Sequence, residues 1–455
     1  MRLAVETGIA RAAGALSRAT GRGGGTTLPG KLLLRLDPGA VAALARRIPH
    51  GAAIVSATNG KTTTSALAAH ILGVRHTLAH NASGANLLSG VASTLLGARS
   101  AELALLEVDE AALPGVLERV APRALLLGNL FRDQLDRYGE LETLAAAWRT
   151  ATAALPASTC LVVNADDPVL AALAAGRDDA LRYGVDDPAQ ARPGLQHAAD
   201  STHCVVCGAP YRYAAAYVGH LGDYRCRQCG NARPPLDIAA RAVQLEGLEA
   251  ASFDLVTPAG TRRVRLPLPG LYNVYNAVAA AALCHALGSP LDDIARGLED
   301  ALPAWGRFER IAVGDGKTVV LLLVKNPAGA NEAVRTVLAG GAAPALVLAA
   351  LNDRTADGKD VSWIWDVDYE PLLAGLDTLV ASGGRAAELA LRFRYGGLER
   401  EQIEVLPELE AALDRALALT PAGGQLIVLP TYTAMLALRE ILAARGHVRN
   451  FWEGA

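Results

Sequence analysis

The sequence predicts an α/β protein with two main domains and a metal-binding insertion in the first. Short apolar runs alternate with helical stretches from Ala52 to about Pro303, and a second alternation of this kind follows Arg307. Such alternation is typical of parallel sheets covered by helices on both faces. Two closely spaced cysteine pairs interrupt the first alternation. We therefore expect a helical lead over 1–48, a central P-loop ATPase domain over 49–310 with an insertion at about 196–236, and a C-terminal Rossmann-like α/β domain over 311–455.

Length and charge limit the functional class. The chain has 455 residues, of which 51% are hydrophobic, and a formal net charge of −3. It is long enough for several cores, and its balanced charge gives no reason to expect a nucleic-acid partner. Glu6 and Arg11 interrupt the apolar N-terminus, so we expect no signal peptide, and no apolar run reaches the length of a spanning helix. We expect a cytoplasmic protein in which residues 3–18 form a packing or interface helix rather than a membrane anchor.

The first strand leads into a phosphate-binding turn. An apolar run from Ala52 to Val55 predicts a buried strand, and a helix is expected over 62–72. Between them, backbone N–H groups would point at an anion, Lys61 adds a mobile positive charge, and the Thr62 hydroxyl can bind Mg²⁺. The generic pattern requires a glycine where Val55 stands; the alternative, a plain capped helix, leaves Lys61 unexplained. We predict that ATP and Mg²⁺ are bound by Thr58, Asn59, Gly60, Lys61, Thr62 and Thr63.

Acidic residues follow the next strong strand, which is expected over 103–108. Glu107 stands at its end and is followed closely by Asp109 and Glu110. A carboxylate at the end of such a strand faces the phosphates, so Glu107 is predicted to bind Mg²⁺ directly or through water. A solvated helix start is the alternative, and for Asp109 and Glu110 both interpretations stay open.

Further polar segments begin where later strands end. Residues 128–139, after a strand over 124–128, carry Asp133 and Asp136 beside two arginines, and residues 164–168 follow a strand over 160–163. Each segment either contributes to a site at the switch point of the sheet or caps a helix. Arg307 lies near the expected hinge between the domains, where an arginine can reach a γ-phosphate on closure.

Four cysteines have the spacing of a four-thiolate zinc ribbon, Cys204-x2-Cys207-x18-Cys226-x2-Cys229. Disulfides are not expected in a cytosolic chain. A glycine follows each pair (Gly208 and Gly230), where backbone N–H groups must approach sulfur. Because protein would fill all four positions, we predict a structural Zn²⁺ and not a hydrolytic centre.

Together these motifs resemble those of the Mur ligases, which form amide bonds through an acyl phosphate. Within that family the chain is most similar to the MurT branch, and the resemblance runs nearly end to end. The features shared with Mur ligases are, in chain order, Ala57-Thr-Asn-Gly-Lys-Thr-Thr63, the Glu107 strand end, Asp133-Gln-Leu-Asp136, the Asn273/Asn276 motif and Gly306-Arg307. The features particular to MurT are Leu28-Pro-Gly30, Asn81-x2-Gly-Ala-Asn86, the zinc ribbon, Lys325-Asn-Pro-Ala-Gly329 and Asp357-Gly-Lys-Asp360-x-Ser-Trp-Ile-Trp-Asp366.

The resemblance implies a Mur ligase-like enzyme that amidates lipid II. ATP would phosphorylate the α-carboxylate of D-glutamate in the stem peptide, and ammonia would displace the phosphate to give D-isoglutamine. Lys61 and Arg307 are the implied catalytic residues of this step. Asn273, Asn276 and Arg307 would join the residues that bind ATP and Mg²⁺. A peripheral position at the inner face of the membrane would follow from the lipid substrate.

The resemblance also implies a partner. Ammonia would come from glutamine through a separate glutaminase subunit, GatD, which forms a heterodimer by contacting the C-terminal domain. Asp360 would complete the partner's Cys–His pair, because a carboxylate fixes the imidazole tautomer. Asp357 and Asp366 lie close by and could be confused with it. Trp363, Trp365 and Tyr369, beside these acids, form either an exposed binding patch or a loop packed on the core.

Several residues depart from the family pattern. Ala57 stands where many Mur ligases have glycine, and Gln134 replaces a histidine of the acidic segment. Lys325 adds a cation to a motif that usually carries an acid, and no lysine lies between Lys61 and Lys317 to be carbamylated. The N-terminal lead is expected to be too short for a full UDP-binding domain. Two alternatives stay open: a stand-alone amino-acid-adding ligase of the Mur or folylpolyglutamate type, and a non-catalytic regulatory protein that binds ATP and zinc.

Overall fold

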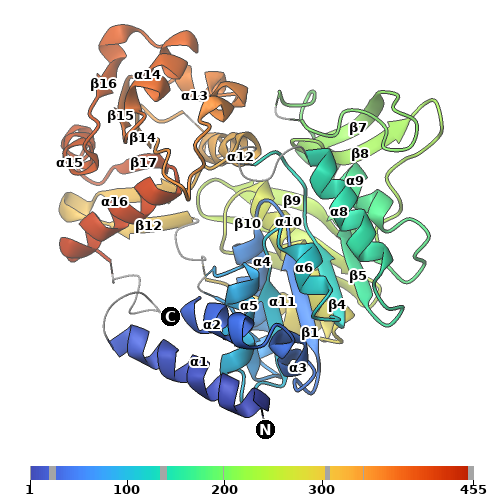
Figure 1. Cartoon of the computed structure of the whole chain (residues 1–455). Helices are drawn as coiled ribbons and strands as arrows, with labels where there is room; N and C mark the ends of the chain where they lie inside the picture. Colours follow the sequence, from blue (N-terminus) through green and yellow to red (C-terminus); the bar gives the residue numbers. More distant parts are fainter. Residues whose placement is uncertain are drawn as a thin grey trace.

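A nine-stranded sheet forms the centre of the larger domain (Figure 1) in the computed structural model, which describes residues 2–19, 27–82, 84–133, 141–197, 199–302, 308–341 and 343–448. The strand order is β11-β10-β9-β6-β5-β4-β1-β3-β2. Neighbours from β2 to β9 pair in parallel, and β9, β10 and β11 pair antiparallel. The bounds are β1 Ala52–Ser56, β2 Leu78–His80, β3 Leu103–Glu107, β4 Ala124–Leu127, β5 Cys160–Asn164, β6 Leu181–Val185, β9 Ile238–Glu246, β10 Ala250–Thr257 and β11 Gly260–Leu266.

Helices cover both faces of this sheet, which explains why its inner strands are apolar throughout. In β1, Ala53 and Val55 pack into one core, while Ala52 and Ile54 pack into the core on the opposite face. The first core includes α4 (Lys61–Gly73), α10 (Leu271–Ala286) and α11 (Leu291–Glu299). The second includes α5 (Leu88–Gly97), α6 (Leu113–Leu117), α8 (Leu141–Ala153) and α9 (Pro168–Leu173). The predicted α/β class is confirmed.

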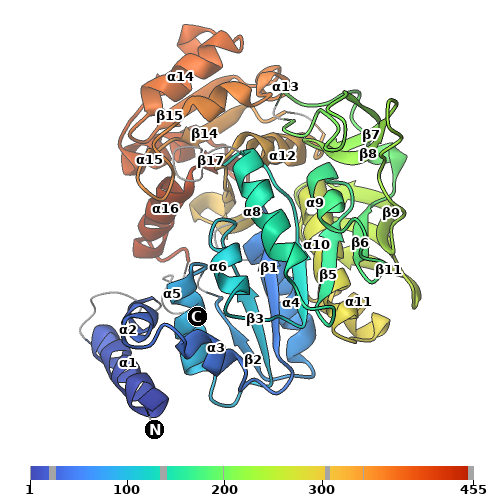
Figure 2. The same ribbon diagram turned by 45° about the vertical axis from the view of Figure 1, so that its right-hand side comes forward.

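The N-terminal residues form helices that pack on the second face. They are α1 (Arg2–Ala19), α2 (Leu28–Leu36) and α3 (Ala40–Ala45), and they lie beside α5 in both views (Figures 1 and 2). The Leu-Pro-Gly motif has a packing reason: a Cβ on Gly30 would lie 1.8 Å from the Ser89 carbonyl oxygen. The Gly30 N–H donates to Ser93 Oγ at 2.8 Å, so α2 and α5 approach at backbone contact.

A long excursion separates two strands that lie side by side. Strand β6 pairs directly with β9, Tyr183 opposite Ile238, so residues 186–237 leave the sheet and return to it. Within the excursion lie the short helix η1 (Pro188–Gln190) and an antiparallel two-stranded ribbon, β7 (Tyr211–Val218) and β8 (Leu221–Cys226). Figure 2 shows the ribbon beside the C-terminal domain. Arg335 on helix α12 (Pro327–Leu338) holds that contact, because its guanidinium donates to the Tyr217 carbonyl at 2.8 Å and to the Gln190 carbonyl at 2.9 Å.

A second sheet organises the C-terminal domain, with six strands in the described part of that domain. Its order is β12-β13-β17-β14-β15-β16, parallel except for the edge pair β12–β13. Strand β12 begins at Phe308, slightly before the boundary expected at 311. The strands are β12 Phe308–Ala312, β13 Thr318–Leu322, β14 Leu346–Ala350, β15 Thr378–Ser382, β16 Ile403–Val405 and β17 Gln425–Pro430.

Helices flank this sheet as well. One core includes α12 (Pro327–Leu338), α13 (Glu370–Leu373) and α14 (Ala386–Tyr395), and the other includes α15 (Leu409–Leu419) and α16 (Tyr432–Ala444). Short 3₁₀ turns are η2 (Gly314–Gly316), η3 (Ser362–Asp366) and η4 (Arg400–Gln402). Of the helices in the described ranges, none has both the length and the apolar content that crossing a bilayer requires.

Candidate active site

A cavity of about 350 Å³ lies between the two domains, at the carboxyl ends of β1, β3 and β4. Its size lies within the usual range of small-molecule sites. The central domain contributes the turn from Thr58 to Thr63 and the acids Glu107, Asp109 and Glu110. The C-terminal domain contributes Lys325 and the first two turns of α12, and the tip of the ribbon contributes Val218 and Leu221. Three segments that are distant in sequence therefore share one cavity.

The turn after β1 is held by backbone geometry and by Asn129. Gly60 has φ +83°, a left-handed value that favours glycine. A Cβ at Gly60 would also lie 2.0 Å from Asn276 Oδ1, so the turn and α10 meet at this glycine. The Asn59 N–H donates to Asn129 Oδ1 at 2.8 Å, and Asn129 Nδ2 donates to the Asn59 carbonyl at 3.0 Å. The turn is therefore pre-organised before any ligand binds.

Lys61 is buried in this turn and paired. Its Nζ donates to Glu110 Oε2 at 2.6 Å, to the Thr58 carbonyl at 3.3 Å and to the Ala57 carbonyl. Burial opposes the charge of Lys61, but Glu110 outweighs it and raises the lysine pKa. The pKa of Glu110 is lowered, because Lys61 and Lys325 overcome the effect of its burial. The structure thus places Glu110 as the partner of Lys61.

Glu107 lies beside the first turn of α4, and hydrogen bonds hold its backbone in place. The Thr62 hydroxyl and Asn86 Nδ2 each donate to Glu107 Oε1 at 3.3 Å. Asn81 brackets the Glu107 backbone: it accepts the N–H at 2.8 Å and donates to the carbonyl at 2.7 Å. A hydroxyl and a carboxylate held together are the hard oxygen ligands that Mg²⁺ prefers, so these residues fit the ion.

The C-terminal domain contacts the phosphate-binding turn directly. Lys325 Nζ donates to the Thr58 carbonyl at 3.1 Å and pairs with the Asp133 carboxylate. Asn326 and Asn59 exchange amide hydrogen bonds, at 2.9 Å and 3.2 Å, and Asn326 also caps α12 by accepting a backbone N–H of its first turn. Burial raises the pKa of Asp133 although Lys325 opposes the rise. The cation noted in the sequence therefore links the two domains at the site.

The predicted asparagine motif lies at the start of α10. Asn276 Nδ2 donates to Asn273 Oδ1 at 3.1 Å, and Asn273 Nδ2 donates to the Pro269 carbonyl at 2.8 Å. Asn276 lines the cavity beside Gly60. Three other residues of the predicted site or its motifs, Gln134, Asp136 and Arg307, lie outside the described residues.

The polar turn after β5 carries Asp166 and Asp167, which stabilise the fold. Tyr275 donates to Asp166 Oδ2 at 2.6 Å, and Arg233 Nη1 donates to Asp166 Oδ1 at 3.0 Å. Asp167 caps α9 by accepting two backbone N–H groups of its first turn. Asp166 is thus part of a buried ion pair, and Asp167 caps the start of a helix.

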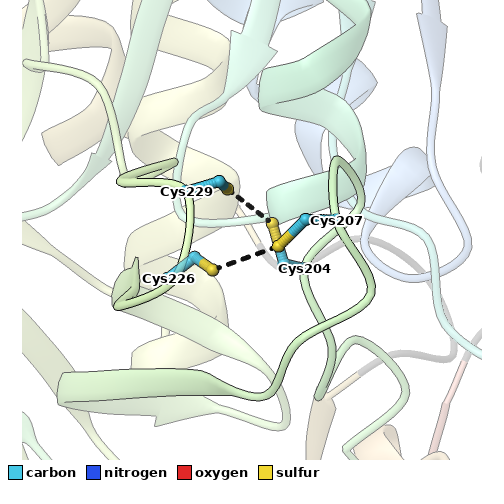
Figure 3. Close-up of side chains that lie close together, drawn as sticks. All are labelled: Cys204, Cys207, Cys226 and Cys229. Atoms are coloured by element: carbon cyan, nitrogen blue, oxygen red, sulfur yellow. Dashed lines mark hydrogen bonds between the residues drawn. The ribbon is translucent and has the colours of Figure 1, made fainter.

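The four cysteines converge at one end of the ribbon (Figure 3). All four sulfurs lie within 4.8 Å of one another. Cys204 and Cys229 are 3.6 Å apart and Cys207 and Cys226 are 3.5 Å apart, far longer than a disulfide of about 2 Å. Gly208 (φ +74°) and Gly230 (φ +79°) turn the chain after each pair, and the Val206 N–H approaches Cys204 Sγ at 3.4 Å. This donor set fits a four-thiolate metal site.

Three acids of the C-terminal motif have different surroundings. Asp357 is buried and accepts from the Thr433 N–H at 2.8 Å, the Thr433 hydroxyl at 2.5 Å and the Arg354 N–H at 3.2 Å. Asp360 is exposed, and hydrogen bonds from the side chain and the N–H of Ser362 lower its pKa. Asp366 is half-buried, with Arg132 Nη2 at 3.6 Å. Asp357 is thus committed to the fold, while Asp360 is accessible.

The aromatic residues near these acids divide between core and surface. Tyr369 is buried and packs on Phe393 with ring centroids 4.7 Å apart. Trp365 is 47% exposed and meets the 75% exposed Tyr395 edge to face. Tyr369 therefore packs on the core, whereas Trp365 lies at the surface and its role in binding stays a prediction.

Sequence reasoning missed several residues that line or shape the cavity. Glu332 belongs to no local motif, and Asn129 and Tyr272 are not singled out within the polar segments that contain them. Nothing in the sequence of the ribbon places Val218 and Leu221 at the site. The position of Asn129 shortly after the end of β4 is a usable signal for that residue. Glu332 occupies an ordinary buried position of an amphipathic helix, so no pattern marks it.

Family models match most of the chain. The Mur ligase middle domain matches residues 55–284, and the MurT ligase C-terminal family matches residues 323–435. The first match covers the central sheet from the end of β1 onwards, and the second covers β14, β15, β16 and β17 of the C-terminal sheet.

Similar proteins of known sequence cover nearly the whole length. The lipid II isoglutaminyl synthase (glutamine-hydrolyzing) subunit MurT of Streptococcus pneumoniae is 34% identical over 435 residues, 94% of each chain. The protein of the same name from Staphylococcus aureus strain N315 is 31% identical, covering 95% of this chain and 96% of the relative.

Solved structures share the fold at lower identity. A pseudomurein peptide ligase type C from Methanothermus fervidus has a TM-score of 0.69 at 21% identity, covering 89% of this chain and 80% of that one. MurF ligase from Thermotoga maritima, solved in complex with ADP, has a TM-score of 0.64 at 14% identity, covering 92% and 85%.

Proposed function

This chain belongs to the MurT branch of the Mur ligase family, and from that membership we propose that it is the ligase subunit of a lipid II isoglutaminyl synthase. The predicted family, fold class and enzyme class are confirmed. In the proposed reaction, the α-carboxylate of D-glutamate in the lipid II stem peptide becomes an amide at the expense of ATP. A Mur ligase that adds an amino acid on its own is the alternative that the experiment below separates.

The phosphate-binding turn is proposed to hold ATP. Lys61, Thr62 and Thr63, at the start of α4, line the cavity, where the helix N–H groups and the ammonium would bind phosphate oxygens. Thr62 and Glu107 would hold Mg²⁺, which when bound neutralises phosphate charge. Lys61 and Glu110 already form a pair, so Lys61 would exchange part of that pairing for phosphate oxygens. Arg307 is proposed to approach the γ-phosphate.

The chemistry proposed for the cavity has two steps. A carboxylate oxygen of the substrate attacks the γ-phosphorus, and ADP leaves, which gives an acyl phosphate. Ammonia then attacks the carbonyl carbon and phosphate leaves, which gives the amide. Closure of the two domains around the substrate would exclude water, which would otherwise hydrolyse the acyl phosphate.

The partner is proposed to be a glutaminase that docks on the C-terminal domain. Asp360 is the accessible carboxylate of its motif and would complete the partner's Cys–His pair. The exposed pair of Trp365 and Tyr395 supplies aromatic surface of the kind enriched in interfaces. Asp357 is unsuited to this role, because hydrogen bonds within the domain occupy both of its oxygens. The four cysteines are proposed to hold a structural Zn²⁺.

The observation that carries the proposal is the combination of full-length MurT similarity with a cavity that residues of both domains line. Mass spectrometry of lipid II after incubation with ATP tests it, with ammonium or with glutamine plus a co-purified glutaminase as donor. We expect the acid to become an amide with either donor, and with glutamine only when the partner is present. Consumption of ATP only when an amino acid is offered would overturn the proposal in favour of a peptide-extending ligase.

A further inference from the structure

Glu332 is a buried acid in the wall of the cavity that the proposed mechanism leaves unused. It lies on α12, one turn beyond the segment that contacts the phosphate-binding turn, and its side chain is 3% exposed. Among the described residues, neither carboxylate oxygen has a hydrogen-bond partner. Buried polar atoms are nearly always satisfied, and exceptions call for an explanation such as a ligand or a catalytic role.

Two neighbouring acids of the cavity are satisfied, which sets Glu332 apart. Glu107 accepts two side-chain hydrogen bonds, and Glu110 accepts one from Lys61. Arg192 Nη2 lies 3.9 Å from Glu332 Oε1, beyond hydrogen-bond reach. The Nε of Arg192 likewise has no partner among the described residues. The two charges are thus close without contact, which leaves both with unused hydrogen-bonding capacity.

Three groups face Glu332 from the elements packed around it. Arg192 approaches from the excursion, Arg335 lies one turn along α12, and Tyr272 comes from α10. Burial raises the pKa of Glu332 although both arginines oppose the rise. Burial also raises the pKa of Tyr272, with Glu332 adding to the effect. A carboxylate kept away from water with a raised pKa is a better base than an exposed one.

The position of Glu332 suits the second half of the reaction rather than the first. The phosphate-binding residues lie on the central domain, whereas Glu332 lies on the C-terminal domain, which also carries the surface proposed for the glutaminase. Ala356, in the same loop as Asp360, lines the same cavity. Ammonia arriving from that domain would therefore meet the α12 side of the cavity.

We propose that Glu332 is a further catalytic residue, the base that takes a proton from ammonia as the carbon–nitrogen bond forms. The inference rests on the proposed amidation. The nitrogen lone pair attacks the carbonyl carbon, the bond from that carbon to the phosphate oxygen breaks, and phosphate leaves with the electron pair. One N–H proton passes to a Glu332 oxygen and afterwards to phosphate. Arg192 and Arg335 disfavour a bound ammonium ion, so neutral ammonia is the species that Glu332 would accept hydrogen bonds from.

The test compares two nucleophiles with the full-length protein, ATP and lipid II. Ammonia gives the amide, and hydroxylamine gives a hydroxamate. Hydroxylamine is a much weaker base than ammonia. After it attacks the carbonyl carbon, its nitrogen therefore loses a proton readily without a base from the protein. In Glu332→Gln, we expect the turnover number with ammonium to fall about 100-fold, within the range for loss of a general base. Hydroxamate formation should fall less than about tenfold.

Matched variants separate chemistry from folding. Glu332→Asp keeps a carboxylate and should recover part of the ammonium-driven rate. Glu388→Gln, a half-exposed acid of α14 outside the cavity, should behave as the parent protein. The pH dependence of the ammonium-driven turnover number should lose the acidic limb in Glu332→Gln, whereas a purely structural role would leave its shape unchanged.

Each outcome decides the inference. Selective loss of ammonium-driven turnover, with hydroxamate formation retained, supports it. Equal loss with both nucleophiles, or no loss with either, overturns it while the amidation by the parent protein stands. A parent protein that forms neither amide nor hydroxamate would overturn the proposed function, and this inference with it.

Discussion

The cavity and the exposed surface of the C-terminal domain hold their acids in opposite ways. In the cavity, Glu107 and Glu110 are buried and already engaged by Thr62 and Lys61. On the surface, Asp360 is exposed and is oriented by an N–H of its own loop. A pre-organised buried cluster can act on whatever enters it, whereas an exposed carboxylate gains a catalytic use only when another chain supplies the groups it orients. We therefore expect two centres whose defects can be separated.

The largest effect is expected from Lys61→Ala, which strikes the buried centre. It removes the cation at the proposed phosphate site and leaves Glu110 buried without its partner. Loss of one preorganised electrostatic group lowers turnover by about 100- to 1,000-fold. Amidation of lipid II, followed by mass spectrometry, should fall by at least that factor with both glutamine and ammonium.

A second variant controls for the effect of leaving Glu110 buried without its partner. Lys61→Ala combined with Glu110→Gln removes the unpaired charge, which otherwise costs about 3–5 kcal/mol. It should regain thermal stability without regaining activity. Ammonium-driven turnover that survives in Lys61→Ala would contradict the assignment of the buried centre.

The next effect is expected at the ribbon, which lines the cavity and contacts α12. Cys226→Ser removes a buried thiolate of the cluster, and structural zinc contributes several kcal/mol to folding. We expect bound zinc, measured by elemental analysis, to fall and the melting temperature to drop. Turnover with both donors should also fall, because Val218 and Leu221 at the ribbon tip line the cavity. Cys160→Ser, outside the cluster, should retain its zinc; equal zinc content in both variants would refute the site.

A smaller effect is expected from Gly60→Ala, which sharpens the account of the turn. The added Cβ meets Asn276 and must adopt φ +83°. We expect the KM for ATP to rise about tenfold, corresponding to about 1.4 kcal/mol of lost binding. Gly176→Ala is a matched control, because Gly176 has φ +79° but nothing within 4 Å of the added atom. It should lose stability without a change in KM; the same KM shift in both variants would contradict the close approach of Gly60 and Asn276.

The smallest effect is the pH dependence of stability in Glu332→Gln. Burial raises the pKa of Glu332 in the folded state. The contribution of Glu332 to the free energy of unfolding is therefore fully present below its unfolded-state pKa of about 4.3 and is lost as pH rises through the folded-state pKa. Glu332→Gln has no titrating group here, so it does not lose stability in this way. Its melting temperature relative to the parent should therefore increase between about pH 4 and pH 8, by an amount equivalent to about 1 kcal/mol. A difference that stays flat, or that decreases with pH, would show that Glu332 is satisfied in solution.

Much of the fold can be predicted because buried parallel strands are recognisable as apolar runs. The sequence patterns predict strands β1, β3, β4 and β5 and helix α4 within a residue or two of their bounds. They do not predict the antiparallel strands β9 to β11 individually, because one side of β11 is exposed and its apolar positions are sparse. The cysteines indicate the excursion, but no local pattern indicates its contact with the C-terminal domain.

The site divides in the same way. Lys61 and Glu107 can be predicted because strand ends and glycine turns have local signatures. The Gly60–Asn276 contact and the position of Glu332 join segments distant in sequence, and tertiary packing alone brings them together. Burial also distinguishes two neighbouring acids of the C-terminal motif, the buried Asp357 and the exposed Asp360. Their closeness in sequence does not predict this difference.

The separation of the two centres is tested most directly by Asp360→Asn in the complex with the glutaminase. The measurement is the ratio of glutamine-driven to ammonium-driven amidation of lipid II, with Asp366→Asn as the matched control. We expect the ratio to fall by about 100-fold to about 10⁴-fold, as for other lost orienting carboxylates, with ammonium-driven turnover unchanged. An equal loss with both donors would show that Asp360 serves the ligase cavity or the fold, and would contradict the account.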